Sequence, residues 1–323
     1  MIDNMLTDVN VYVLNRQVID PAELSRFLED HGVSWESDSD VGAEVTSEVG
    51  GRVCYMSFAK PRPGGNAAYL KHIKEVGHGS VLEHAVWTLI ITGVSRSLSH
   101  ELVRHRAGWA YSQLSQRYVD ESEVTFVVPP DLEYEVTMAR QYLDQTKIDV
   151  ETATATFFGT TEERPSLPPR ERIYAGLRWL RNMYRNREDY KVLAEYQMMK
   201  VESELAKRYR LDPEYHADDP DLRASELGLI AAQKTEKRKF ARQSARSVLP
   251  NATETKIQVT VNARAARHFI ELRASRHADP EIRRLAYLMW TTLALEAPNL
   301  FSDYQTTRLL DGTYELTTSF PKV

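Results

Sequence analysis

Two hydrophobic periods occur along this chain, and together they predict a fold of strands and helices. Residues 85–94 form an apolar run rich in β-branched side chains, which is typical of a buried strand. Residues 256–261 alternate apolar and polar side chains, which predicts a strand with one buried face. Shorter runs of strand-forming residues predict three more strands, at residues 9–14, 52–58 and 124–128.

Helical spacing covers most of the remaining chain. Tyr69, Ile73 and Val76 fall on one face of a helix predicted over residues 67–76. Residues 280–295 predict a helix that begins with a proline, which is favoured at the first helical position. Further helices are predicted over residues 21–30, 95–106 and 264–274 and over most of 132–245, with breaks at 159–169 and 212–220. The mixture predicts a helix-rich α/β (α+β) fold.

The order of these elements predicts the domain organisation. Residues 1–50 are acidic and irregular, and we expect them to form an N-terminal extension. We expect the main domain over residues 51–300, with a helical insertion at about 130–235. Residues 301–323 are expected to form a peripheral tail. The length of 323 residues is enough for one large domain or two ordinary ones.

Composition narrows the class of protein. Hydrophobic residues make up 42% and charged residues 27% of the chain, as in ordinary globular proteins. The formal net charge of −5 argues against a nucleic-acid partner. No apolar run is long enough to cross a membrane, and the first residues predict no signal peptide. Cys54 is the single cysteine, which excludes an intramolecular disulfide and favours a cytoplasmic protein.

The densest chemistry lies in residues 104–118, which include three arginines, one histidine, two serines, two glutamines and three aromatic residues. Because an arginine must be paired before it can be buried, this segment does not predict a core element. Guanidinium groups capture phosphate or carboxylate at two points, and aromatic side chains stack on planar rings. The segment predicts a pocket for a phosphorylated, ring-bearing small molecule or a patch for single-stranded nucleic acid.

A second polar cluster begins directly after the strand predicted at 256–261. Asn262 and Arg264 lie near the start of a helix, where free N–H groups and the helix dipole favour an anion. Arg264 and His268 share one face of that helix. On spacing alone, a solvated helix with its own salt bridges is the more common arrangement.

Other ligand motifs are weak or absent. His78 and His84 have a spacing that is poorly suited to metal ligation on a helix or a strand, so no metal site is expected. The sequence has no G-x-G-x-x-G turn and no P-loop, so any nucleotide is bound by other means. Cys54 lies within the strand predicted at 52–58 and is expected to be buried and structural.

Four blocks of sequence carry most of these polar residues. The first block, residues 78–84, opens with His-Gly and closes with Glu-His. The second has Arg104-His105-Arg106, then Ser115, then Arg-Tyr at 117–118. The third is Ala-Arg-Ser-Val-Leu-Pro at 245–250, and the fourth has Asn-Ala-Arg and Leu-Arg-Ala-Ser-Arg-His between 262 and 277. In this order the blocks resemble the flavin-dependent thymidylate synthases, whose hallmark is R-H-R, seven residues, S and shortly R-Y.

The resemblance implies that family's fold, with a central mixed sheet, in a homotetramer whose active sites lie at subunit interfaces. It implies FAD as cofactor, NADPH as reductant, and transfer of a one-carbon unit from methylenetetrahydrofolate to C5 of the uracil of dUMP. The partner is then a small nucleotide, and neither nucleic acid nor membrane is expected. Implied flavin contacts are Ser80, Arg104, His105, Arg106, Gln113, Asn262, Arg264 and His268. Implied nucleotide contacts are Glu101, Arg104, Gln113, Leu114, Ser115, Arg117, Arg246 and Arg273, and His78 is similar to the family's histidine near the folate.

Arg273 and Ser115 are the catalytic residues that the resemblance implies. A fixed cation such as Arg273 at the uracil edge would stabilise negative charge on N3 and O4 and make C5 more nucleophilic. No base adjoins Ser115 in the sequence, so orienting the substrate is favoured over nucleophilic attack for this residue. Arg117 and Arg246 suit two-point capture of the nucleotide phosphate.

The chain departs from the family pattern near the implied nucleotide site. Eight residues instead of seven separate the R-H-R motif from the serine, which lengthens a predicted loop that holds Trp109 and Tyr111. Their rings could stack on flavin or base, or pack against a neighbouring subunit. Gln113 stands where the family usually has Glu, and Glu101 where it often has Gln. Because Glu101 could accept a hydrogen bond from a ribose 2′-hydroxyl, a UMP-preferring methylase for modified-nucleoside biosynthesis is an alternative.

Two other interpretations of the sequence stay open. A non-catalytic single-stranded RNA-binding protein would use residues 104–118 as a basic aromatic patch and would be colourless. A flavoprotein that oxidises NADPH without methyl transfer would be yellow. The presence of Ser115, Arg117, Arg246 and Arg273 argues against the second.

Overall fold

The computed structural model describes residues 5–6, 8–60, 62–158, 168–209 and 220–322. They form two compact units. The sheet unit comprises Thr7–Gln113, Pro129–Asp131 and Thr255–Val323, and the helical unit comprises Met1–Leu6, Leu114–Val128 and Leu132–Glu254. The helix-rich α/β (α+β) fold expected from the sequence is confirmed. The breaks expected at 159–169 and 212–220 lie almost entirely outside the described residues.

A four-stranded sheet forms the centre of the sheet unit. Its strands, in spatial order, are β2 (Asn10–Arg16), β3 (Val86–Ser95), β6 (Glu254–Asn262) and β4 (Trp109–Gln113). β2 pairs antiparallel with β3, and β4 pairs antiparallel with β6. The Oγ1 atoms of Thr88 and Thr260 lie 3.0 Å apart and link β3 to β6. Alternate residues of β6 are buried, as its period of two predicted.

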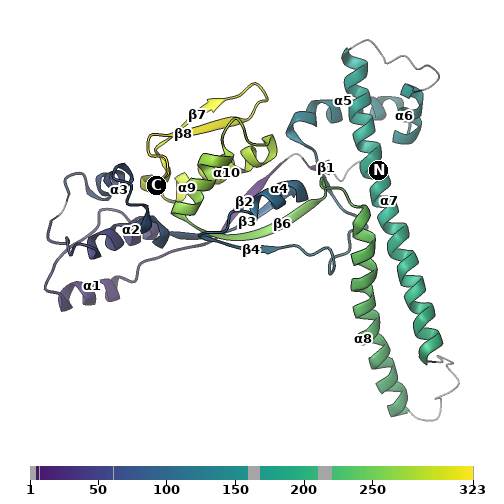
Figure 1. Cartoon of the computed structure of the whole chain (residues 1–323), viewed down its shortest axis with the longest axis horizontal. Helices are drawn as coiled ribbons and strands as arrows, with labels where there is room; N and C mark the ends of the chain where they lie inside the picture. Colours follow the sequence, from purple (N-terminus) through teal and green to yellow (C-terminus); the bar gives the residue numbers. More distant parts are fainter. Residues whose placement is uncertain (1–4, 7, 61, 159–167, 210–219, 323) are drawn as a thin grey trace. The chain divides into compact units, whose positions relative to one another are not determined.

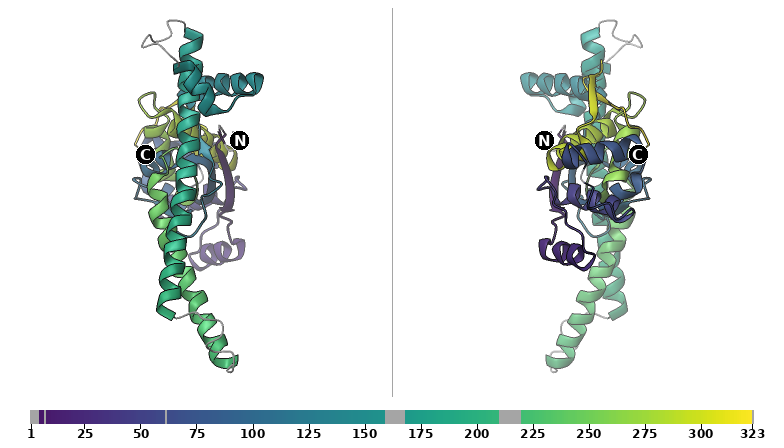
Figure 2. Two further views of the ribbon diagram at one scale, coloured as in Figure 1. Left: turned by 90° about the vertical axis from the view of Figure 1, so that its right-hand side faces the viewer. Right: turned by 90° about the vertical axis from the view of Figure 1, so that its left-hand side faces the viewer.

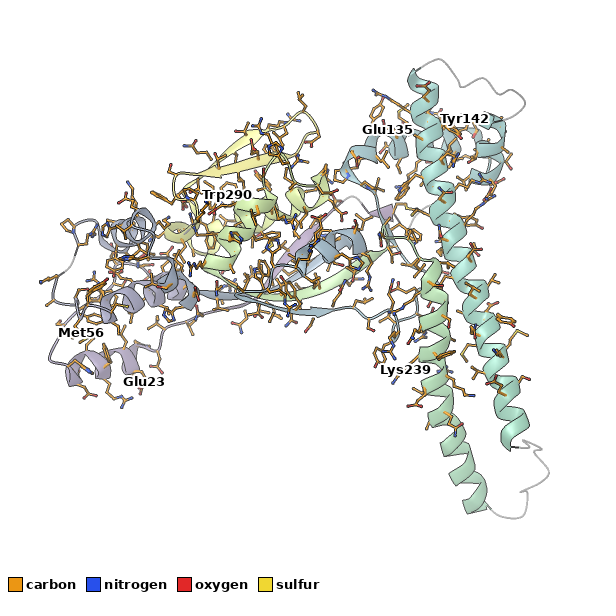
Figure 3. All side chains as sticks on the ribbon, in the orientation of Figure 1. Glu23, Met56, Glu135, Tyr142, Lys239 and Trp290 are labelled. Carbon is orange, nitrogen blue, oxygen red and sulfur yellow. The ribbon has the colours of Figure 1, made fainter. Side chains whose placement is uncertain are left out.

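Two helices that follow the sheet strands in the chain cover one face of the sheet (Figure 1). They are α9 (Ala263–Arg273) and α10 (Pro280–Glu296). Together with α4 (Arg96–Leu102) they bury an apolar core with the inner side chains of β3, including Trp87, Leu89 and Ile91. Trp290, labelled on α10 in Figure 3, donates its indole N–H to the Phe301 carbonyl at 3.0 Å, so its polar atom is satisfied.

Short helices and a hairpin complete the sheet unit. These are α1 (Pro21–Asp30), α2 (Gly42–Val53), α3 (Gly65–Glu75), η1 (Gly79–His84), η2 (Pro130–Leu132), α11 (Pro298–Phe301), β7 (Tyr304–Arg308) and β8 (Tyr314–Thr318). Residues 301–323, expected to be peripheral, contribute Phe301, Tyr304 and Leu316 to the main core.

The strand predicted over residues 52–58, with a buried cysteine, is wrong. Helix α2 continues to Val53, and Cys54 follows it with an exposed side chain. The buried face of α2 carries charged residues, among them Glu44, Glu48 and Arg52. A helical period built from charged side chains is invisible to a hydrophobic pattern, which explains the error.

These charges belong to a network of buried polar residues within the sheet unit. The Arg52 guanidinium donates to Glu48 at 2.6 Å. A second centre is Asp303, which accepts hydrogen bonds from Arg267 at 2.7 and 2.8 Å and from Lys74 at 2.7 Å. Burial alone would raise the pKa of Asp303, but the hydrogen bond and charge of Arg267 outweigh it and hold the pKa well below its usual range.

The helical unit consists of two long helices and shorter elements packed against them. Its elements are β1 (Met5–Leu6), β5 (Phe126–Val127), α5 (Glu133–Thr146), α6 (Val150–Phe158), α7 (Pro168–Tyr209), α8 (Pro220–Ala245) and η3 (Arg246–Val248). β1 and β5 pair in parallel. α7 and α8 lie side by side (Figure 2). α5, α6 and α7 bury their own core, which includes Val136, Leu143, Leu177 and Leu180.

None of the helices in the described ranges combines the length and the apolar character that crossing a membrane needs.

We predict that Asp303→Ala lowers the free energy of unfolding by about 3–5 kcal/mol, because it leaves buried Arg267 and Lys74 without their carboxylate. Urea denaturation followed by circular dichroism measures this. As a control, Glu296→Ala removes the partner of exposed Arg16 and should cost less than about 1 kcal/mol. Equal losses in the two variants would contradict the assignment of Asp303 as the central buried anion.

Candidate active site

The Arg-His-Arg motif lies in a tight connection between α4 and β4. α4 ends at Leu102, whereas the sequence predicted a helix to residue 106, so the motif follows the helix after Val103 and does not form its last turn. Gly108 closes the connection with φ +75°, and a Cβ there would lie 2.7 Å from the Asn262 amide nitrogen. Only glycine fits this position, because the backbone is left-handed and the space is filled. The connection is thereby held against the start of α9.

The loop expected around Trp109 and Tyr111 is wrong, because both residues lie on strand β4. They pair with Val261 and Val259 of β6. Their rings stack on each other, with centroids 5.7 Å apart and planes at 5°. The Tyr111 hydroxyl donates to the carbonyls of Leu102 and His105. In this subunit the rings therefore fix the R-H-R connection.

Arg273, His105 and Glu101 form one polar cluster, although they come from α9, the R-H-R connection and α4. Arg273 Nε donates to His105 Nε2 at 3.1 Å, and its Nη1 donates to Glu101 at 2.8 Å. The three side chains are partly buried. Because His105 accepts a hydrogen bond from a cation, its ring is neutral in this arrangement.

The pKa of His105 agrees with a neutral ring. Burial and then the charge of Arg273 lower the pKa of His105 from 6.5 to about 4. The His105 ring also lies 6.4 Å from that of His268, between centroids, and 5.1 Å from that of Phe269. His105 thus joins the Arg273 cluster to the outer face of α9.

A cavity of about 410 Å³ opens at the start of α9. Its lining includes three residues predicted as flavin contacts: Asn262, Arg264 and His268. The Asn262 side chain accepts a hydrogen bond from the Ala265 N–H at 2.8 Å, so it caps the helix as well as lining the cavity. The other lining residues are Glu83, Ala107, Gly108, Ala265 and Lys322.

Two charged residues of this cavity were missed as site residues. Arg264 forms an ion pair with Glu83 at 2.6 Å, and both side chains are about half exposed. Lys322 reaches the cavity from the end of the chain, and its backbone N–H donates to Glu271 at 3.0 Å. Glu83 closes the first sequence block, so its position was a usable signal. Lys322 has no local pattern that could have revealed it.

The other predicted residues of the sheet unit lie apart from the two clusters or point inward. Gln113 donates its amide to Ser99 Oγ at 2.8 Å and to Thr255 Oγ1 at 3.2 Å, so its N–H groups are used within the fold. His78 and Ser80 are exposed at the start of η1. Arg104 and Arg106 are exposed, and within the described part of the chain neither forms an ion pair.

Leu114, Ser115, Arg117 and Arg246 belong to the helical unit. The Ser115 carbonyl accepts from the N–H groups of Tyr118 and Val119, which makes a turn. Arg242, one turn before Arg246, donates to the Tyr118 carbonyl at 2.6 Å and pairs with Asp120. Lys239, labelled on α8 in Figure 3, lies 4.8 Å from the Tyr118 ring. The segments that carry Arg117 and Arg246 are therefore neighbours.

Among the described residues, no group of three His, Cys, Asp or Glu side chains is arranged to hold a metal ion. The cationic cavity and the Arg273 cluster suit anionic, ring-bearing organic ligands.

Comparison with known proteins identifies the family. A family model described as "Thymidylate synthase complementing protein" matches residues 38–299. The flavin-dependent thymidylate synthase of Mycobacterium leprae is 40% identical over 91% of this chain and 92% of its own length. That of Mycobacterium tuberculosis is 41% identical over 91% of each chain. The chain belongs to the flavin-dependent thymidylate synthase family.

A solved structure shares the fold of this family member. It is a UMP/dUMP methylase, PolB, from Streptomyces cacaoi bound with 5-Br dUMP, with 18% sequence identity and a TM-score of 0.51. The match covers 93% of this chain and 95% of that one. Family membership makes the protein a methyltransferase of this type and implies a flavin cofactor. It favours the enzyme over the RNA-binding interpretation of residues 104–118.

We predict that His105 titrates near pH 4. Arg273→Gln should raise the pKa of His105 toward 6.5, because it removes a positive charge whose Nε lies 3.1 Å from His105 Nε2, while the ring stays buried. In the wild-type protein, the neutral His105 ring makes its full contribution to the free energy of unfolding above about pH 6.5. This contribution is lost as the pH falls toward 4. NMR titration of the imidazole C–H resonance measures the shift. Arg276→Gln, a control that removes an exposed arginine paired with Glu315, should leave the value unchanged. A wild-type pKa above 6 would refute the buried, cation-bonded state.

Proposed function

We propose that the protein methylates C5 of the uracil of a uridine monophosphate nucleotide, dUMP, UMP or both. The proposed co-substrates are methylenetetrahydrofolate as the one-carbon donor and NADPH as the reductant, with FAD as the bound flavin. The observation that carries this proposal is the position of Arg273, which Glu101 and His105 hold in the last turn of the helix whose first turns line a cationic cavity.

The donor set of that cavity fits a flavin nucleotide. Arg264, His268 and Lys322 supply cationic or hydrogen-bonding groups, and the dipole of α9 favours a pyrophosphate at the start of the helix. When bound, reduced flavin supplies the hydride that completes the methyl group. A volume of about 410 Å³ encloses only part of so large a cofactor, so we propose that neighbouring subunits of a homotetramer supply the remaining walls.

Arg273 is proposed to act on the uracil. A guanidinium facing N3 and O4 stabilises the negative charge that develops as C5 attacks the one-carbon unit. Glu101 and His105 fix two of its N–H groups, which leaves the rest of the guanidinium for the base. Because His105 stays neutral, it adds no second charge beside the substrate.

Phosphate capture is proposed for Arg117 and Arg246, with Ser115 orienting the nucleotide. Arg117 and Arg246 are exposed and lie on neighbouring segments of the helical unit. A nucleotide monophosphate carries close to two negative charges, and two guanidinium groups match that charge. His78 is proposed to lie near the folate.

We predict a functional split between two arginines of α9. Arg264→Ala should lose flavin during purification, whereas Arg273→Ala should stay yellow and lose methyl transfer by a factor on the order of 10²–10³, the effect of removing one electrostatic contact to a transition state. Flavin absorbance per subunit and product formation separate the two effects. Arg26→Ala, which removes an exposed arginine of α1, is the control and should change neither. If Arg264→Ala keeps its colour and loses only activity, the flavin assignment is wrong.

Two observations favour UMP, with its ribose, as a substrate. A UMP/dUMP methylase shares the fold, and Glu101 carries a carboxylate within the Arg273 cluster. A carboxylate can accept a hydrogen bond from a ribose 2′-hydroxyl.

We predict turnover of both UMP and dUMP, with Glu101→Gln lowering kcat/KM for UMP at least about tenfold more than for dUMP, as for a lost charge-assisted hydrogen bond. Parallel assays of the two nucleotides measure the ratio. No turnover of UMP by the wild-type enzyme at any concentration excludes the ribonucleotide. An equal loss for both substrates restricts Glu101 to holding Arg273.

A further inference from the structure

A second cavity, of about 500 Å³, lies within the helical unit. Residues of α5, α6 and α7 and of the short strands β1 and β5 line it. Figure 1 shows α5 and α6 near one end of α7. None of the residues assigned above to flavin, nucleotide or folate lines it. Its volume is within the range of small-molecule sites, which is roughly 300–1,000 Å³.

Apolar side chains form part of the walls of this cavity. Leu143, Val150 and Leu180 are buried side chains of the helical unit's own core, and Phe126 is 1% exposed. Tyr184 adds an aromatic ring from α7. This apolar part of the lining suits a hydrocarbon or aromatic body.

Three cations reach the same cavity. They are Arg140 on α5, Lys147 at the end of α5 and Arg187 on α7. Within the described ranges, neither Arg140 nor Lys147 forms an ion pair. Arg187 lies over the Tyr184 ring at 5.6 Å and is only 12% exposed.

Arg187 carries the strongest sign of a missing partner. Its Nε is buried and has no hydrogen-bond acceptor among the described residues. The nearest carboxylate oxygen, from the adjacent Glu188, is 3.6 Å away, beyond hydrogen-bond distance. A buried guanidinium that is incompletely hydrogen-bonded is costly, so the negative charge of an oxyanion in this cavity would stabilise it.

The acidic residues of the cavity do not neutralise these cations. Glu151 accepts hydrogen bonds from Arg181 at 2.7 Å and from Arg185 at 2.5 and 2.7 Å. Asp149 accepts from the N–H and hydroxyl of Thr152, at 2.9 and 2.6 Å, at the start of α6. The third, Asp144, is exposed on α5. The lining carries three cations and three carboxylates, but Glu151 and Asp149 already accept hydrogen bonds from groups outside it.

We propose that this cavity binds a small amphipathic oxyanion, a carboxylate or phosphate carried on an apolar body of about ten carbons. Arg187 bonds the oxyanion at two points, with Arg140 and Lys147 at the rim, and the apolar body packs between α5, α6 and α7. The site is separate from the proposed methylation chemistry and does not depend on it.

The test is isothermal titration of the full-length, flavin-loaded protein with decanoate, decyl phosphate and decanol, each below its aggregation concentration. We expect both anions to bind and decanol to bind at least about tenfold more weakly, because it lacks the charge. Arg187→Gln should weaken decanoate at least about tenfold and leave decanol unchanged. Binding of decanol as tight as that of the anions, or no binding of either anion at millimolar concentration, overturns the proposal.

Arg172→Gln is the matched control. Arg172 is also on α7 and also lies over a tyrosine ring, Tyr134, at 5.2 Å, but its side chain is 56% exposed and does not line the cavity. It should bind decanoate like the wild type. Equal weakening in Arg172→Gln and Arg187→Gln overturns the site. If Arg187→Gln fails to fold, judged by its melting temperature and circular dichroism, Arg140→Gln and the comparison with decanol decide the question.

Discussion

The buried contact between Arg267 and Asp303 is the constraint on which the candidate site depends. Arg267 is fully buried in the middle of α9, and Asp303 precedes the C-terminal hairpin. A buried guanidinium is tolerated only where a carboxylate is placed to meet it, so this contact fixes how α9 is rotated over the sheet. The exposed face of α9 then presents Arg264 and His268, and its last turn presents Arg273.

The charged groups of the interior and those of the candidate site differ in how their hydrogen bonds are used. Inside, Asp303 accepts hydrogen bonds from both Lys74 and Arg267, and only the Arg267 Nε lacks an acceptor among the described residues of this cluster. At the edge, Arg273 is held by one carboxylate and one neutral imidazole and keeps N–H groups available. A guanidinium that is fixed in place but has N–H groups free is preorganised to stabilise negative charge that develops in a transition state. Without it, solvent would have to reorient to stabilise that charge.

The two units contain cavities of different character. The cavity of the sheet unit is lined by polar groups at the start of a helix, which suits a phosphate-bearing ligand. The cavity of the helical unit is lined by apolar side chains together with charged ones, three of them cationic, which suits an anion with an apolar body. Its lining comes from α5, α6 and α7 with β1 and β5. Because these elements show only ordinary helical and strand patterns in the sequence, no pattern predicted this cavity.

The sequence by itself determined most of the helices and strands, the position of the R-H-R motif near the end of a helix and the family to which the chain belongs, because these depend on local periodicity and on linear motifs. It also placed Asn262 at the start of α9 correctly. Only the tertiary structure decided that Arg273 meets Glu101, 172 residues away, that Lys322 reaches the cavity of Arg264, and that Trp109 and Tyr111 form a strand. Cys54 was misplaced because the helix before it buries charges, and such burial is stable only with partners from distant segments, as between Glu44 and Asn299. Contacts of this kind follow from how elements pack, and no local pattern of residues encodes them.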